Sequence, residues 1–182
     1  MLTTNQYEDL VVGSGPLLAQ YAKTLSRGYD KAFVAGAMMG IAIAPELALV
    51  ERPGSAAIND ATYNALTGAL DVADKSKVDE HFIGLVLLKV IKTSPRPKLA
   101  PNPLTIRDVE SLFTKESMRT DIKARSYRRN KAFVAGVILA TSSIAGSPIQ
   151  PFTLMYDAKV QINTMYDVQN YLKASLLEVT HG

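Results

Sequence analysis

Apolar residues recur at helical spacing along much of the chain. Between residues 82 and 90, and again between 166 and 177, they lie mostly three or four positions apart, as the buried face of a helix requires. A further stretch, from Asn59 to about Asp74, begins with two residues that favour a helix N-cap and keeps the same spacing. The pattern predicts a helix over 59–74 and one in each of the other two segments.

Three residue pairs mark where helices are expected to begin. A Ser or Thr followed three positions later by an acidic residue resembles a capping box, here with Asp in place of the preferred Glu. These pairs predict helices that start near residues 77, 106 and 165. The pairs are Ser76 with Asp79, Thr105 with Asp108, and Thr164 with Asp167.

The segment Gly13–Pro16 combines residues that interrupt regular structure with one that favours a first helical turn. We expect a flexible turn there, leading into a helix over 16–27 that stops before Gly28. Strand patterns are confined to Leu47–Val50 and to Phe152–Ile162, which alternates loosely. The predicted fold class is therefore mainly α, a helical bundle with at most a minor β hairpin.

An internal repeat is the most informative feature of the sequence. Lys31–Gly36 recurs without change as Lys131–Gly136, 100 residues later. Glycines at 36 and 40, and small residues at 136 and 140, give each copy a strip of small residues on one helical face. Such strips let backbones approach closely. Two arrangements remain open: the two helices pack against each other around a pseudo-twofold axis, or each is the core helix of its own half.

The repeat suggests two related halves joined by a proline-rich connector. We expect a first helical half over 1–93, a connector over 94–104 and a second helical half over 105–182. Four prolines in the connector favour an extended backbone. We interpret the fold as a bundle with an internal two-fold duplication.

Charge is distributed unevenly. Residues 1–88 hold 6 basic and 10 acidic side chains, a net charge of −4, whereas residues 89–131 hold 12 and 4, a net charge of +8. A basic cluster of this kind attracts phosphate through counterion release and without base specificity. The alternative is a solvated helix face, or one that pairs with the acidic first half of a neighbouring copy.

The candidate nucleic-acid-binding residues lie in that basic block. If residues 119–131 are helical, Arg125, Arg128 and Arg129 share one side of the helix, and Tyr127 lies near enough to stack on a base. The full set of candidates is Lys115, Arg119, Lys123, Arg125, Tyr127, Arg128, Arg129 and Lys131.

Residues for catalysis or metal binding are scarce. The chain of 182 residues has no cysteine and two histidines, His81 and His181, so a thiolate site is excluded and a multi-histidine metal site is not expected. Paired carboxylates lie in polar stretches typical of solvated faces. We expect neither a catalytic residue, nor a cofactor, nor a metal.

These observations favour a non-enzymatic structural or assembly protein. It would self-associate as a homo-oligomer and contact RNA or DNA through the basic block, as a virion, capsid, nucleocapsid or packaging component does. An acidic N-terminus argues against a signal peptide and for a cytoplasmic or virion location. Two alternatives are a small helical adaptor that binds one protein partner, and a membrane-inserted protein built on the two apolar repeats, although both are short or interrupted for a span.

Overall fold

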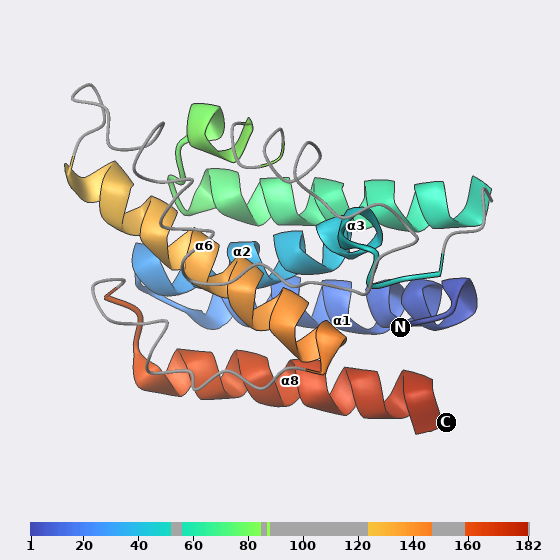
Figure 1. Ribbon diagram of the computed structural model, residues 1–182. Helices are drawn as coiled ribbons and strands as arrows, with labels where there is room; N and C mark the ends of the chain where they lie inside the picture. The colour runs from blue at the N-terminus through green and yellow to red at the C-terminus, as the bar shows by residue number, and fades with distance from the viewer. Residues whose placement is uncertain (52–55, 85–86, 88–123, 147–158, 182) are drawn as a thin grey trace.

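A computed structural model describes residues 1–51, 56–84, 87, 124–146 and 159–181. For residues 56–59 and 124–127 it describes the backbone only. The predicted mainly α fold is confirmed (Figure 1). Within these residues no strand forms, and the sole β interaction is an isolated parallel bridge between Leu2 and Val50. The elements are α1 (Thr4–Thr24), α2 (Gly28–Ile43), the 3-10 helix η1 (Ala44–Leu47), α3 (Ala56–Lys75), α6 (Ala124–Ala145) and α8 (Ile162–His181).

The first helix begins far earlier than the sequence predicted. Thr3 caps α1 in a capping box with Gln6, so the helix is already formed before Gly13–Pro16, which lies inside it. The predicted flexible turn and the predicted helix start at Pro16 are therefore wrong. Buried residues recur at helical spacing from Tyr7 to Ala22, and this apolar face outweighs the weak local preferences of glycine and proline.

Helix α2 occupies the centre of the bundle. It contacts α1, α3, α6 and α8, and it is buried on every side from Ala32 to Ile43. A helix that is apolar on all sides is stable only where other helices bury all of those sides. In Figure 1, α3 lies on one side of α2 and α8 on the far side of α1, while α6 crosses α2 diagonally.

The two repeated segments form α2 and α6, and these helices pack directly on each other. A Cβ atom on Gly36 would overlap the carbonyl oxygen of Phe133, and one on Gly136 would overlap that of Phe33. A Cβ atom on Gly40 would lie 2.7 Å from the Cβ of Ala140. Of the two arrangements left open by the sequence, direct packing of the repeats is the one found. The reciprocal glycine contacts are those that a local two-fold relation produces.

One hydrophobic core contains residues from both predicted halves. Phe33 and Met39 of α2, Phe133 and Leu139 of α6, and Leu172 of α8 are all fully buried in it. The connector over 94–104 lies outside the described residues. The division at residues 93 and 105, and the duplication itself, therefore stay predictions, but the packing is shared across that division.

Two other helix starts differ from their predicted positions. Helix α8 begins at Ile162, so Thr164 and Asp167 lie within its first turns and do not form its cap. The helix expected near residue 77 begins at Glu80, because Lys77 adopts a left-handed conformation with φ 63° and interrupts the chain after α3. The start near 106 lies outside the described residues.

The prediction of a helix over 59–74 is confirmed by α3, whereas that of a strand over Leu47–Val50 is wrong. Leu47 ends η1, and Ala48 takes a left-handed φ of 58°, which turns the chain away from an extended path. Of the second predicted strand, residues 159–162 are coil or helix, and 152–158 lie outside the described part.

Candidate nucleic-acid interface

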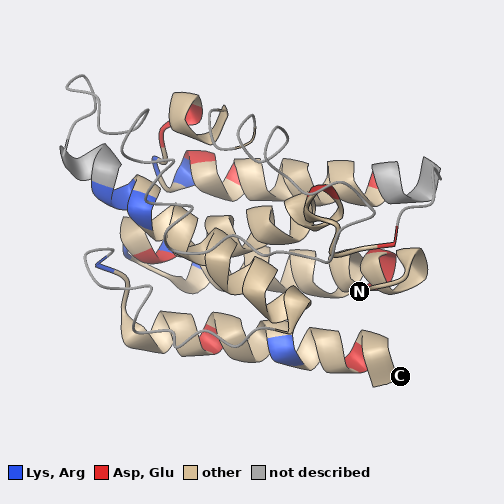
Figure 2. Ribbon diagram, in the orientation of Figure 1, with Lys and Arg blue, Asp and Glu red and all other residues tan. Residues whose placement is uncertain are grey.

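Basic side chains gather at one end of the bundle. This basic end is where α1 and α3 finish and where α2, α6 and α8 start (Figure 2). Among the described side chains, only Lys173, well inside α8, is a basic residue elsewhere. The residues of the basic end are Lys23, Arg27, Lys31, Lys75, Lys77, Arg128, Arg129, Lys131 and Lys159.

Specific contacts bring these helix ends together. The Nη2 atom of Arg27 donates to the carbonyl oxygen of Lys159 at 3.1 Å, which ties the start of α8 to the link between α1 and α2. Lys23, Lys31 and Lys75 line one small hollow between α1, α2 and α3. The clustering of charge is therefore a product of the fold, since these residues are far apart in the sequence.

Acidic residues at the same end offset part of this charge. Asp71 forms an exposed ion pair with Lys75 at 3.0 Å, an interaction worth little in water. Asp30 is buried and points its carboxylate at a backbone amide. Counting also Asp74, Asp79, Glu80 and Asp167, nine basic side chains face six acidic ones, so the basic end keeps a net positive charge.

The opposite end of the bundle is acidic. Among the described side chains it carries no Lys or Arg. The described part of the molecule therefore carries charge of opposite sign at its two ends. The acidic residues there are Glu8, Asp9, Glu46, Glu51, Asp60 and Glu178.

Arg129 is partly buried where α6 meets the start of α2. Its guanidinium carbon lies 5.7 Å from the ring centroid of Tyr29, within the range of a cation–π contact. A Cβ atom on Gly28 would lie 3.0 Å from Nη2, so glycine at that position leaves room for the guanidinium. The Nε atom is buried and has no hydrogen-bond partner among the residues that the structure describes. Arg129 is thus held in place by packing, with donor capacity left over.

The other predicted interface residues are placed only in part. Arg128 is exposed, and Lys131 is partly buried and already engaged in an interaction. Arg125 and Tyr127 lie in the first turns of α6, where the structure describes the backbone only. Lys115, Arg119 and Lys123 lie outside the described residues.

Sequence reasoning missed several members of the basic end. Lys31 lies in α2, Arg27 just before α2 and Lys159 just before α8, and none of the three is in the basic block. Each does lie within four residues of a helix start, which is a signal that the sequence contains. What the sequence lacks is the information that these starts meet at one end of the bundle.

Two buried polar residues position the helix starts around this end. An Oδ1 atom of Asp30 accepts a hydrogen bond from the backbone N–H of Gln161 at 2.8 Å, just before α8. Oδ1 of Asn130 accepts one from the N–H of Asp79 at 3.2 Å, just before the short helix at Glu80. Each side chain is therefore an N-terminal acceptor for a helix in the other predicted half.

Two tyrosines have raised pKa values without forming a reactive cluster. Burial raises the pKa of Tyr7 from 10.0 to about 12, and its hydroxyl donates to the carbonyl oxygen of Ile41 at 2.8 Å. Burial also raises the pKa of Tyr21, with a further contribution from the hydrogen bond that its hydroxyl donates to Asp167 at 2.8 Å. Both hydroxyls are used as hydrogen-bond donors between helices, which is a structural role.

Metal-binding groups and membrane-spanning helices were considered for the described residues alone. No group of three or more His, Asp or Glu side chains converges there in a way that would hold a metal ion. None of the described helices is long and apolar enough to cross a bilayer. In comparisons with known proteins, no family model, curated protein or solved structure matches this chain.

Proposed function

We propose that this chain is a non-enzymatic structural protein that self-associates and contacts the phosphate backbone of nucleic acid through its basic end. The observation that carries the proposal is the convergence of nine Lys and Arg side chains at one end of the bundle, from four helices and from the links beside them. A virion, nucleocapsid or packaging component would use such a surface, in the cytoplasm or in the particle.

The helix arrangement favours a polyanion at this end. Helices α2, α6 and α8 begin here and α1 and α3 end here, so three N-termini with partial positive charge outnumber two C-termini with partial negative charge. Arg27, the N-cap of α2, makes no side-chain capping bond to the backbone N–H groups of the first turn. Arg128 is exposed beside them, and the predicted basic block leads directly into it along the sequence.

Charge polarity supports self-association. An acidic end on one copy complements the basic end of the next, and a head-to-tail contact of this kind generates open filaments or rings. Nucleic acid and a second copy would then compete for the same basic end. We therefore expect association to weaken as salt is added, because both partners are held by charge.

Binding to random-sequence oligonucleotides tests the proposal. We expect affinity to fall steeply between about 50 and 200 mM salt, with a slope set by the number of phosphates neutralised. Replacing Arg125, Arg128 and Arg129 by Gln should lower the affinity and flatten the slope by up to about 0.9 per lost phosphate contact. Lys173→Gln, which removes one charge away from the basic end, is the control and should change neither quantity appreciably.

The same purified protein tests assembly. Light scattering should show oligomers that grow with concentration, and ultraviolet absorbance should reveal copurified nucleic acid. If the triple variant binds oligonucleotides like the wild type, the nucleic-acid proposal is wrong, and the helical adaptor becomes the better reading. A protein that stays monomeric at every concentration and salt would contradict the assembly role.

A further inference from the structure

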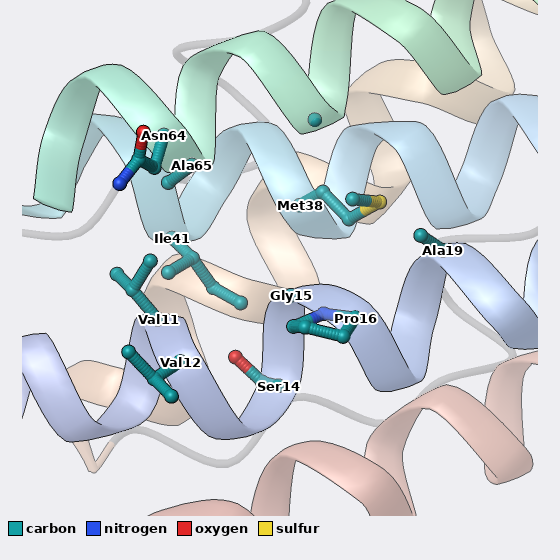
Figure 3. A pocket seen from close by; sticks show the side chains of 11 residues that line it. Val11, Val12, Ser14, Gly15, Pro16, Ala19, Met38, Ile41, Asn64 and Ala65 are labelled. Carbon is teal, nitrogen blue, oxygen red and sulfur yellow. The ribbon is translucent and has the colours of Figure 1, made fainter.

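A pocket of about 400 Å³ opens on the side of the bundle between α1, α2 and α3 (Figure 3). Helices α1 and α3 form its walls, and α2 supplies Met38 and Ile41 at its base. It is distant in sequence from the basic block, and no member of the basic end lines it. The pocket is therefore separate from the proposed nucleic-acid interface.

Small residues on the two walls create the space. Gly15 and Ala19 on α1 face Ala65 and Gly68 on α3. A Cβ atom on Gly15 would meet nothing within 4 Å, and one on Gly68 would meet only the terminal carbon of Met38, at 3.3 Å. Protein interiors are normally packed without voids of this size. The α1–α3 contact thus leaves room for a guest molecule.

Among the described residues that line the pocket, none has a charged side chain. Its polar groups are the hydroxyl of Ser14, which is used in a bond to the carbonyl of Leu10, and the amide of Asn64, which is exposed. Transfer of an ion into such surroundings is costly, whereas covering the apolar lining is favourable. A ligand that matches this lining is therefore neutral and largely apolar.

Pro16 adds one directional feature to the wall. Helix α1 continues through Pro16, and because proline has no N–H, the carbonyl of Val12 lacks its helical donor. Val12 and Pro16 both line the pocket. A backbone acceptor without its usual partner is a group that a ligand donor satisfies.

The dimensions fit a small molecule better than a protein segment. The lining on α1 runs from Val11 to Ala19, about 12 Å at 1.5 Å per residue, which is only about two turns of a helix lying along it. The volume lies within the range of about 300–1,000 Å³ that is typical of small-molecule pockets. We propose that this pocket binds a neutral, largely apolar small molecule carrying one hydrogen-bond donor.

A fluorescent probe with these properties tests the proposal on the full-length protein. N-phenyl-1-naphthylamine is neutral, apolar and carries a single N–H, and it brightens in apolar surroundings. We expect saturable binding with one site per chain. Gly68→Leu and, independently, Ala19→Leu fill the pocket from opposite walls and should each weaken binding at least tenfold. Gly13→Leu is the matched control, since Gly13 does not line the pocket and a Cβ there meets nothing within 4 Å.

The donor is tested separately with the N-methyl derivative of the probe, which lacks the N–H. The wild type should bind the parent probe several-fold more tightly. Pro16→Ala returns an N–H to the carbonyl of Val12 and should abolish this preference. The proposal is overturned if binding does not saturate, or if both filling variants, folded by circular dichroism, keep wild-type affinity. Equal binding of the two probes to the wild type would overturn the assignment of the Val12 carbonyl.

Discussion

Asp30 and Asn130 stand 100 residues apart and make matching contacts across the bundle. Each is fully or almost fully buried in the first turns of a repeated helix, and each accepts a hydrogen bond from the backbone just before a helix of the other predicted half. The side chain of Asp30 accepts from the N–H of Gln161, and that of Asn130 accepts from the N–H of Asp79. The two halves are therefore fastened reciprocally.

Removal of the acceptor at position 30 should destabilise the start of α8. Asp30→Ala leaves the N–H of Gln161, in a part-buried hydrogen bond, without its partner, at a cost of about 1–2 kcal/mol in the free energy of unfolding. Asp30→Asn keeps an acceptor, as Asn130 does, and should stay within about 1 kcal/mol of the wild type. Urea denaturation measures both values. Faster hydrogen exchange confined to the first turn of α8 in the Ala variant would locate the effect, and unchanged exchange there would contradict it.

The glycine contact between α2 and α6 should tolerate no added atom. Gly36→Ala and Gly136→Ala each place a methyl group onto a backbone carbonyl of the facing helix, so the helices must separate. We expect each substitution to cost about 3 kcal/mol or more. Gly13→Ala is the control: its Cβ meets nothing, and its higher helix propensity should leave stability unchanged or raise it by up to about 1 kcal/mol. Equal midpoints in urea for all three variants would refute the close contact.

Stability should fall in alkali because of Tyr7. Its pKa is 10.0 when exposed and about 12 in the fold, so the folded state holds the proton more tightly. The stabilisation is complete below pH 10 and is lost as the pH rises from 10 to 12, amounting to about 2–3 kcal/mol. Tyr7→Phe loses the bond to Ile41 but also the titration, so its free energy of unfolding should decline less over this range. If the free energy of unfolding declines equally above pH 10 in the wild type and in Tyr7→Phe, the raised pKa of Tyr7 is not the cause of the decline.

Neither half of the chain should fold by itself. The apolar surface of α2 is covered largely by α6, and Phe33 and Phe133 are both fully buried. Fragments 1–93 and 105–182, prepared separately, should give weak helical circular dichroism with no cooperative melting. Mixing them should restore helicity and a melting transition that depends on concentration. Two fragments that each melt cooperatively alone would show two independent cores.

Much of the fold was readable from spacing and composition. The apolar period predicted α3 and α8, and the small residues at 36, 40, 136 and 140 indicated closely packed helices without deciding whether α2 and α6 pack on each other. The start of α1 was missed because Gly13 and Pro16 were given more weight than the Thr3–Gln6 cap and the buried stripe behind it. Local preferences of one or two residues are small beside the burial of a whole helical face.

The candidate site was readable to a smaller degree. The basic block did indicate Arg128 and Arg129, yet only tertiary packing reveals that Arg129 rests on Tyr29 and that Arg27 reaches Lys159. Such contacts depend on which helix ends meet, and no local pattern encodes that. The pocket could not be predicted either, because it forms where small residues of two helices, α1 and α3, face each other above α2.

The pairing of Gly40 with Ala140 shows what fusion of two copies allows. Under the proposed duplication, an ancestor with one copy per chain would have formed this crossing between two identical chains. Any mutation would then have changed both helices of the contact at once. In a single chain each face mutates separately, and here one side has kept glycine while the other has alanine. Covalent linkage thus gives evolution two independent surfaces where symmetry would have imposed one.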